Sequence, residues 1–351
     1  MKGEKERSAF FAAQGINEPF PIVSLSSAAN RYKDSENVWL IRLSVLLSNF
    51  SLVREVWARR RAFDVLYARD HQLLLPIAFA KFALRKRVLF ESHFILAKRG
   101  SQFAVELVAR MADGIVAITQ NLQAYYSRFT PRTIVSYCAA SEPQRFSSIS
   151  ESVSELRKAL DLPQEAIIIC YTGNMAYTGT GHSYGIEDII RSLPLLPEKF
   201  VFVGVGRKEN ERLLPEQIAY DLGVENRALF RGWVTRDEVT RHIVAADILV
   251  VPASGAQPGN SPTKMFEYLA AGKLIVAANT EAIAEVLRDG ENALMVDYKN
   301  PQAWADAFGK IVNDAGLSGK LAEHARADSQ FYSWEKRGET IVGFISDTIH
   351  E

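Results

Sequence analysis

The stretch Ser261–Ala278, SPTKMFEYLAAGKLIVAA, contains the change from helix to strand on which the fold depends. Its apolar residues first recur at helical spacing. Ser261 suits the cap of that helix, Pro262 its first position and Gly272 its end. Residues 274–278 then read as a short buried strand. The stretch therefore predicts a helix that leads directly into a strand.

The start of this helix carries groups that can bind a ligand. Ser261, Pro262 and Thr263 form its first turn, where unpaired backbone amides favour an anion. Lys264 adds a cation suited to a diphosphate. Glu267 lies a turn further along, where a solvated position, a capping role or a ligand role are all open.

The same alternation extends over the second half of the chain. Continuous apolar strands that alternate with helices predict a parallel, doubly wound sheet. The expected strands are 166–173, 199–206, 227–234, 247–254, 273–278 and 293–298, and the expected helices are 185–192, 208–222, 236–246, 262–271 and 281–288.

The first half repeats this pattern less completely. Its expected strands are 21–26, 63–69, 87–93, 113–119 and 133–138, and a polar linker follows at 139–150. The predicted class is α/β, with two Rossmann-like doubly wound domains that face a cleft. We expect an N-terminal domain over residues 1–145 and a C-terminal domain over 146–330.

Charge divides the chain unevenly, although its formal net charge is zero. Residues 1–150 hold 21 Lys and Arg against 12 Asp and Glu, and the remainder holds 20 against 29. The basic half suits a phosphate-bearing acceptor, an anionic membrane or a nucleic acid, and equally a solvated surface. Phe50, Val53, Val56 and Trp57 are predicted to share a helical face beside arginines, a pattern that fits peripheral membrane attachment or a core.

Other features narrow the class of protein. Cys138 and Cys170 lie in separate apolar runs, which favours buried thiols over a disulfide or metal site. Residues 1–7 are charged, but the apolar run that a signal peptide requires does not follow them. The apolar stretch 38–53 is interrupted by polar residues and too short for a spanning helix. We therefore expect a cytoplasmic protein. Nucleic-acid binding is disfavoured because aromatic stacking motifs are absent beside the basic runs.

From Ile168 onward, and more weakly over 21–146, the sequence resembles glycosyltransferase family 4, whose members are retaining, nucleotide-sugar-dependent enzymes of the GT-B fold. Besides the opening stretch, the motifs that carry the resemblance are YTGN (171–174), FVGVGRKENERL (202–213), FRGWVTRDEV (230–239), ADILVVPA (246–253), EVLRDGENALMV (285–296), FDVLYARD (63–70), LFESH (89–93) and SWEKR (333–337). The last resembles the start of a closing helix, expected over 331–351, that packs back toward the first domain.

The resemblance implies roles for particular residues. Glu267 would accept hydrogen bonds from the ribose hydroxyls of the donor, Lys264 would contact its phosphates, and His93 would lie near the donor sugar. Glu91 shares a strand face with His93, where an orienting role and a purely structural role are both open. No metal or cofactor is expected, and the acceptor would be a glycan or a lipid-linked molecule. The other residues expected to contact the donor are Gly173, Asn174, Arg207, Arg231, Trp233, Gly259, Asn260, Ser261, Pro262 and Thr263.

Three departures from the family pattern matter. Gly259 stands where the family commonly has a second glutamate, so the amides of residues 259–261 are expected to serve in its place. Asn174 and Tyr184 replace an Arg and a Lys that would bind the diphosphate, and His182 and Arg207 are candidate substitutes. The usual opening strand and glycine-rich turn are missing, which predicts a truncated first domain and impaired turnover.

Three alternatives remain beside a glycosyltransferase. A nicotinamide oxidoreductase is disfavoured because VFVGVG (201–206) continues as RKEN without a third glycine. A GT-B sugar-nucleotide epimerase would share the donor site. A degenerate, non-enzymatic sugar-nucleotide-binding protein would account for the three departures.

Overall fold

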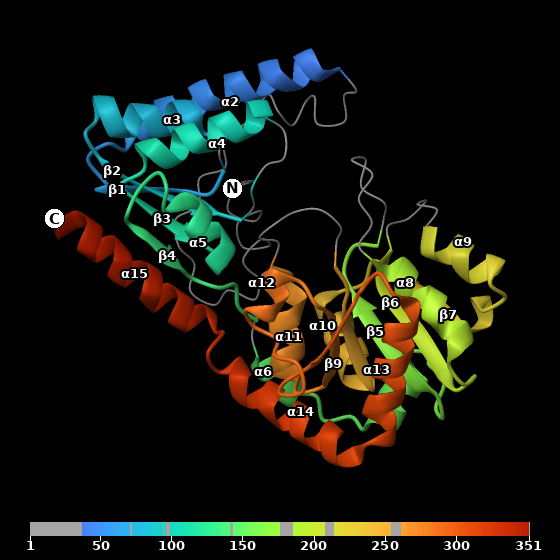
Figure 1. Ribbon diagram of the computed structural model, residues 1–351. Coiled ribbons are helices and arrows are strands. Elements are labelled where there is room, and N and C mark those ends of the chain that lie inside the picture. Colours follow the sequence, from blue (N-terminus) through green and yellow to red (C-terminus); the bar gives the residue numbers. More distant parts are fainter. Residues whose placement is uncertain are drawn as a thin grey trace. The chain divides into compact units, whose positions relative to one another are not determined.

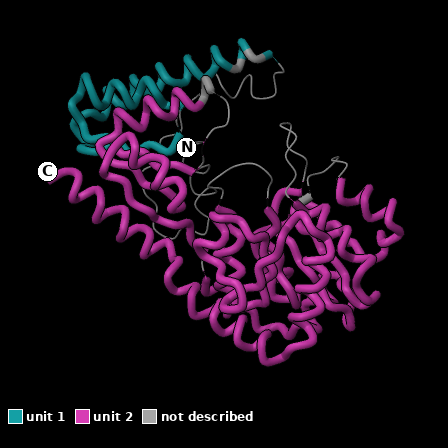
Figure 2. Tube along the Cα trace, viewed as in Figure 1, with its two compact units in different colours: residues 1–88 teal, residues 89–351 magenta. Residues whose placement is uncertain are grey.

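The computed structural model describes residues 37–70, 72–93, 95, 99–140, 143–175, 185–207, 214–253 and 261–350. The chain divides into two compact units, residues 1–88 and 89–351 (Figure 2). The predicted strand 21–26 lies outside the described residues. The predicted domain boundaries stay predictions.

A six-stranded sheet forms the centre of the second half of the chain (Figure 1). Its order is β10-β9-β8-β5-β6-β7, and its neighbouring strands pair in parallel. All six strands predicted from residue 166 onward are thereby confirmed. Their bounds are β5 Ile167–Thr172, β6 Phe200–Arg207, β7 Ala228–Gly232, β8 Ile248–Val251, β9 Leu274–Ala278 and β10 Leu294–Val296.

Helices pack on both faces of this sheet, as a doubly wound topology requires. In one layer α8 contacts both α9 and α13, and in the other α10 contacts α7 and α11, which in turn contacts α14. Fully buried aromatic side chains, among them Tyr171, Phe202 and Trp304, fill the core between layer and sheet. The bounds are α7 Val153–Ala159, α8 Ile186–Ser192, η3 Leu193–Leu195, α9 Leu214–Asp221, η4 Glu225–Arg227, α10 Arg236–Ala245, α11 Thr263–Ala271, α12 Glu281–Ala284, α13 Pro301–Asn313 and α14 Ala315–Ser329.

A four-stranded sheet of order β1-β2-β3-β4 belongs to the first half of the chain. Phe344 of α15 packs against β3, and a Cβ on Gly114 would lie 2.6 Å from its ring. A glycine at this position therefore lets α15 approach the sheet closely. The bounds are β1 Val65–Ala68, β2 Arg87–Ser92, α4 Arg99–Met111, β3 Gly114–Ala117, α5 Gln120–Tyr126, β4 Thr133–Val135, α6 Gln144–Ser147 and α15 Trp334–His350.

The described part of the first unit also contains a helical pair. The long helix α2 (Val38–Ala58) contacts α3 (Leu74–Ala78), which continues into the π-helical turn η2 (Phe79–Ala83). The rings of Trp57 and Phe79 lie 6.1 Å apart between centroids. Within the described residues, no helix has both the length and the apolar character needed to cross a bilayer.

Candidate functional site

A pocket of about 210 Å³ lies at the carboxyl ends of β5 and β6, beside the first turns of α11. In open parallel sheets this edge is where ligands bind. The strand ends and the nearby helices each contribute lining residues, and most of the polar side chains come from α11. The lining residues are Thr172, Gly173, Val205, Gly206, Trp233, Val234, Val239, Thr263, Lys264 and Glu267.

Two glycines shape the floor of the pocket. Gly173 and Gly206 have φ angles of 129° and 118°, which side-chain-bearing residues rarely adopt. A Cβ on Gly206 would lie 2.5 Å from the carbonyl oxygen of Gly173, and a Cβ on Gly173 would lie 3.2 Å from the Nζ of Lys264. Glycine at both strand ends therefore keeps the backbone and the lysine close to the pocket.

Lys264 is held in place by Tyr171. Its Nζ donates a hydrogen bond to the Tyr171 hydroxyl at 2.7 Å and lies 3.9 Å from the centroid of the same ring. That hydroxyl in turn donates to the carbonyl oxygen of Asn174 at 2.8 Å. Burial lowers the pKa of Lys264 to about 7, and the nearby Glu267 carboxylate opposes this only in part. An anion in the pocket would add to the effect of Glu267 and favour the charged form of Lys264.

Glu267 lies on the pocket side of α11, one turn after Lys264. Burial raises its pKa, while the charges of Arg236, Arg145 and Lys264 act to lower it. α11 buries its apolar side chains against the sheet, so its polar residues are the ones left to face the pocket. The helix thus presents an ammonium and a carboxyl group to one small cavity.

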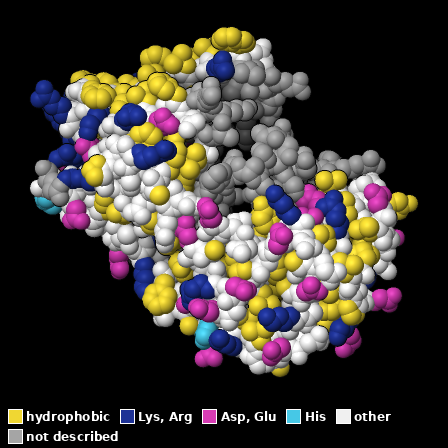
Figure 3. Space-filling model, in the orientation of Figure 1, with side chains coloured by type: hydrophobic (Ala, Val, Ile, Leu, Met, Phe, Trp, Pro, Cys, Tyr) yellow, Lys and Arg dark blue, Asp and Glu magenta, His cyan; other side chains and the backbone are white. Residues whose placement is uncertain are grey.

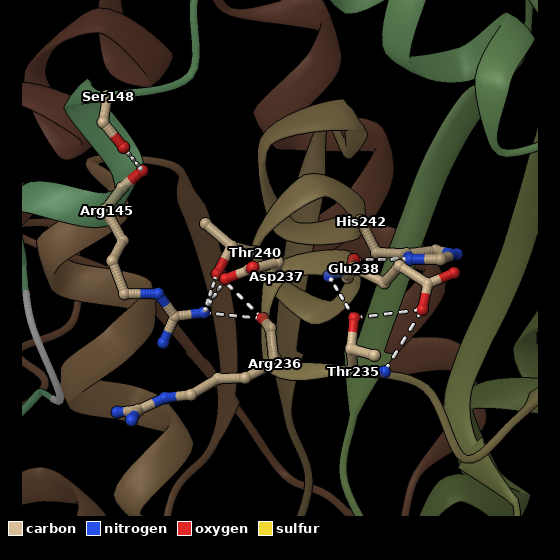
Figure 4. Close-up of polar contacts among 8 residues, drawn as sticks. All are labelled: Arg145, Ser148, Thr235, Arg236, Asp237, Glu238, Thr240 and His242. Carbon is tan, nitrogen blue, oxygen red and sulfur yellow. Dashed lines mark hydrogen bonds and ion pairs between the residues drawn. The ribbon is translucent and has the colours of Figure 1, made fainter. Parts of the chain in front are cut away.

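Arg145 links α6 to the start of α10 (Figure 4). It donates a hydrogen bond to the carbonyl oxygen of Arg236 at 2.6 Å and another to the hydroxyl of Thr240. A capping box between Thr235 and Glu238 fixes the same helix end. These contacts fix the side chain of Arg145 and the backbone of Arg236, and the charges of both arginines act on the pocket glutamate.

The sequence-predicted His93 belongs to a second polar cluster, at the end of β2, and does not line the pocket. The Nε2 of His93 hydrogen-bonds Glu91, a buried carboxylate. Arg337 of α15 pairs with Glu91 at 2.8 Å and also donates to the carbonyl oxygens of Ser136 and Tyr137. α15 therefore supplies the countercharge for the carboxylate that contacts His93.

Five of the predicted donor-site residues meet in the pocket: Gly173, Trp233, Thr263, Lys264 and Glu267. Asn174 lies next to it and contributes its carbonyl to Tyr171. Arg231 instead donates to the carbonyl oxygen of Asp161 at 2.8 Å and does not line the pocket. Gly259, Asn260, His182 and Tyr184 lie outside the described residues, as does the side chain of Arg207. The roles of these residues in binding or catalysis stay predictions.

The predicted start of α11 is wrong by one residue. Pro262, and not Ser261, is the N-cap, and the helix begins at Thr263. Ser261 lies one residue too early for its hydroxyl to cap the first turn. Its Oγ is buried and, among the described residues, has no hydrogen-bond partner. The predicted helix end at Gly272 is confirmed, with φ 60°.

Sequence reasoning missed Tyr171 and Arg337. Tyr171 belongs to the YTGN motif, but its position inside a buried strand indicates a core residue. Arg337 ends the SWEKR motif, and only a view of the folded sheet shows which carboxylate it reaches.

The pocket residues lie in a segment of the chain that matches a known protein family. Residues 166–314 match the model of the family described as Glycosyl transferases group 1. A D-inositol 3-phosphate glycosyltransferase of Xylanimonas cellulosilytica is 31% identical over 191 residues, which are 53% of this chain and 44% of that protein. The lipopolysaccharide core biosynthesis glycosyltransferase LpsE of Rhizobium meliloti is 30% identical over 201 residues, 57% of this chain and 52% of LpsE. The chain thus spans about half the length of the curated relatives it matches.

Solved structures show the fold. Anabaena Alr3699/HepE in complex with UDP superposes with a TM-score of 0.73 at 21% identity, covering 87% of this chain and 84% of that one. The sucrose-phosphate synthase of Thermosynechococcus elongatus superposes with a TM-score of 0.71 at 17% identity, covering 88% of this chain and 78% of that one. The predicted GT-B fold with two parallel α/β sheets is therefore confirmed. The matched family model and these curated relatives are those of glycosyltransferases.

Proposed function

We propose that this chain is a glycosyltransferase that moves a sugar from a nucleotide-sugar donor to an acceptor hydroxyl with retention of configuration and without a metal. The observation that carries the proposal is the pocket at the ends of β5 and β6, where α11 presents Lys264 and Glu267 beside two positive-φ glycines. This pocket lies inside the segment that matches the glycosyltransferase model.

Each part of the pocket suits one part of such a donor. The diphosphate would bind the N-terminus of α11 and the ammonium of Lys264, because unpaired amides and a cation both favour an anion. The Glu267 carboxylate would accept hydrogen bonds from the ribose hydroxyls. Trp233, which is 71% exposed and lines the pocket, would cover the base.

The chemistry requires positioning and stabilisation of a leaving group. The acceptor oxygen would attack the anomeric carbon from the face that the diphosphate leaves, forming one C–O bond as the bond to the phosphate breaks. The departing phosphate would take the acceptor proton, while α11 and Lys264 stabilise the remaining negative charge. His93, held by Glu91, would steady the donor sugar.

The acceptor in this proposal is a glycan or a lipid-linked sugar, in the synthesis of a glycan, lipopolysaccharide or exopolysaccharide. The similarity to LpsE supports this class of pathway. We also propose a cytoplasmic location with peripheral contact to the membrane through the basic N-terminal half. A soluble donor and a membrane-bound acceptor would then meet at the same enzyme.

A thermal-shift panel of UDP-, GDP- and ADP-sugars tests the donor. Structures of Alr3699/HepE hold UDP and UDP-glucose, so uridine diphosphate sugars come first. One sugar nucleotide should raise the melting temperature in proportion to its affinity. Analysis of products with a glycan acceptor then separates transfer from epimerisation and from binding alone. A panel in which no sugar nucleotide stabilises the chain would refute the proposed donor site.

Glu267→Ala gives a sharper test of the same site. Loss of its hydrogen bonds to the ribose should weaken donor binding by on the order of 2–3 kcal/mol, measured by calorimetry. Glu323→Ala, an exposed glutamate on α14, is the matched control and should leave donor affinity unchanged. Equal donor affinity in the two variants would remove Glu267 from the site.

A further inference from the structure

The long helix α2 carries its large apolar side chains on the outside. Trp39, Phe50 and Trp57 are 76%, 57% and 51% exposed. Together with Leu43 and Leu46 they follow one another at intervals of four, three, four and seven residues, which places them along one side of the helix. Figure 3 shows hydrophobic side chains gathered over this helix. We call Trp39, Leu43, Leu46, Leu47, Phe50 and Trp57 the outer stripe.

The inner side of α2 is polar where it is most buried. Among the described side chains of α2, only Ser44 and Asn49 are buried, at 2% and 5% exposure. The Asn49 amide donates to the carbonyl oxygen of Gln72 at 2.8 Å and accepts from the amide of Leu75 at 3.3 Å, at the start of α3. An ordinary surface helix buries its apolar side and exposes its polar side. α2 departs from this pattern, because its most exposed large side chains are apolar and its two buried side chains among those described are polar.

The charges around the outer stripe are mostly positive. Residues 38–61 hold five arginines and one glutamate, and that glutamate, Glu55, is paired with Arg59. The guanidinium groups of Arg42 and Arg60 lie 5.6 and 4.0 Å from the ring centroids of Trp39 and Trp57, near the two ends of the helix. Tryptophan and arginine both suit a boundary between apolar and aqueous phases, since each combines an apolar body with a polar group.

We propose that α2 lies flat on the surface of an anionic phospholipid bilayer, with the outer stripe among the upper acyl chains and the arginines at the phosphates. A free interfacial helix needs a polar face toward water, but α2 has α3 behind it, so only its outer side must suit lipid. The inference deepens the peripheral contact of the proposed function and names its surface and its lipid charge.

Charge favours a lipid over a second copy of the chain. Two outer stripes packed on each other would bring the arginines of both helices together, with Glu55 already neutralised by Arg59. Anionic headgroups instead supply the opposite charge, and each Lys or Arg near the surface adds to the attraction. The bilayer is therefore the occupant that both the apolar stripe and its basic border fit.

Vesicle flotation with the full chain tests this surface. We expect binding to phosphatidylcholine vesicles to rise when phosphatidylglycerol is added and to fall with salt. The double variant Leu46→Glu/Phe50→Glu should reduce binding about tenfold or more, because charges would enter the acyl region. The control is Tyr220→Glu, a 71% exposed aromatic on α9, which should bind vesicles like the unmodified chain. Brominated lipids should quench Trp39 and Trp57, an effect that Trp39→Phe/Trp57→Phe abolishes.

Several outcomes would overturn the proposal: equal binding to neutral and anionic vesicles, equal binding of the double variant and its control, or a dimer in ultracentrifugation that the double variant dissolves without any vesicle binding. Phe50→Ser replaces the double variant if melting curves show that the latter is unfolded. Donor binding by the same proteins is a separate readout. A chain that floats with vesicles but binds no nucleotide sugar would refute the donor site and leave the lipid surface standing.

Discussion

The helices α11 and α2 differ in which kind of side chain they bury. α11 buries Met265, Phe266 and Leu269 completely and leaves Lys264 and Glu267 at the pocket. α2 exposes its largest apolar side chains and buries Ser44 and Asn49. The difference teaches that apolar spacing identifies a helix, while the surface against which it folds decides which side faces inward.

The largest test of this contrast replaces one phenylalanine in each helix. Phe266 is fully buried, with its ring centroid 5.2 Å from that of Tyr332, so Phe266→Ala should lower the free energy of unfolding by about 3–5 kcal/mol. Phe50 is 57% exposed, and Phe50→Ala should change it by less than about 0.5 kcal/mol. Urea denaturation measures both. A similar loss in the two variants would show that the outer stripe is covered in solution.

The second test concerns the polar side of α11. Lys264→Met should weaken binding of a nucleoside diphosphate by about 2–3 kcal/mol, because a charge-assisted contact is lost at a half-buried site. Calorimetry measures this change. Lys273→Met is a contrasting control, since Lys273 donates to the carbonyl oxygens of Val244 and Ala246 and does not line the pocket. It should lower stability and leave the affinity of the folded protein near normal.

The third test concerns the polar side of α2. Asn49→Ala removes the part-buried contacts that join α2 to the carbonyl of Gln72 and the amide of Leu75. We expect the free energy of unfolding to fall by about 1–3 kcal/mol. Ser51→Ala, an exposed polar position on the same helix, should be nearly neutral. The contrast between the helices fails if Asn49→Ala costs less than Phe50→Ala.

The smallest expected effect is a dependence of donor binding on pH. Burial lowers the pKa of Lys264 from 10.5 in the unfolded chain to about 7. The unfolded chain therefore holds an extra proton between about pH 7 and 10.5, and this residue makes stability rise with pH across that window. A bound diphosphate would restore the charge, so binding should take up a proton, and affinity should fall above pH 7 by up to about tenfold per unit. Calorimetry in buffers of different ionisation enthalpy measures that proton, and Lys264→Met should abolish it.

The strands of the second half were predictable because their apolar runs are continuous, and those of β5, β6, β7 and β8 end at or beside a Gly or Pro. β5 and β9 begin and end within a residue of the predicted bounds. Gly173 and Glu267 were predictable as pocket residues because a strand end and a helix start face the same sheet edge in this topology. These inferences need only local pattern and a known order of elements.

The features that the sequence did not predict depend on contacts between residues that are distant in the chain. Tyr171 and Lys264 are 93 residues apart, and neither local sequence predicts their hydrogen bond. The face of α2 was also misjudged: Val53 and Val56 were grouped with Phe50 and Trp57, but both valines are half-buried and the two aromatic side chains are exposed. Apolar residues occur all around this helix, so spacing alone could not select its outer side.

The contacts of Arg337 have a consequence for the order in which the protein is made. Ser136 and Arg337 are 201 residues apart, so at ordinary translation speeds roughly 10–40 s separate the synthesis of β4 from that of the arginine that bonds to its end. During that interval the emerging four-stranded sheet holds Glu91 without its countercharge and β3 without Phe344. The sheet therefore completes its packing only after the six-stranded domain has left the ribosome, and a chaperone that shields nascent chains would find its substrate in the earlier half.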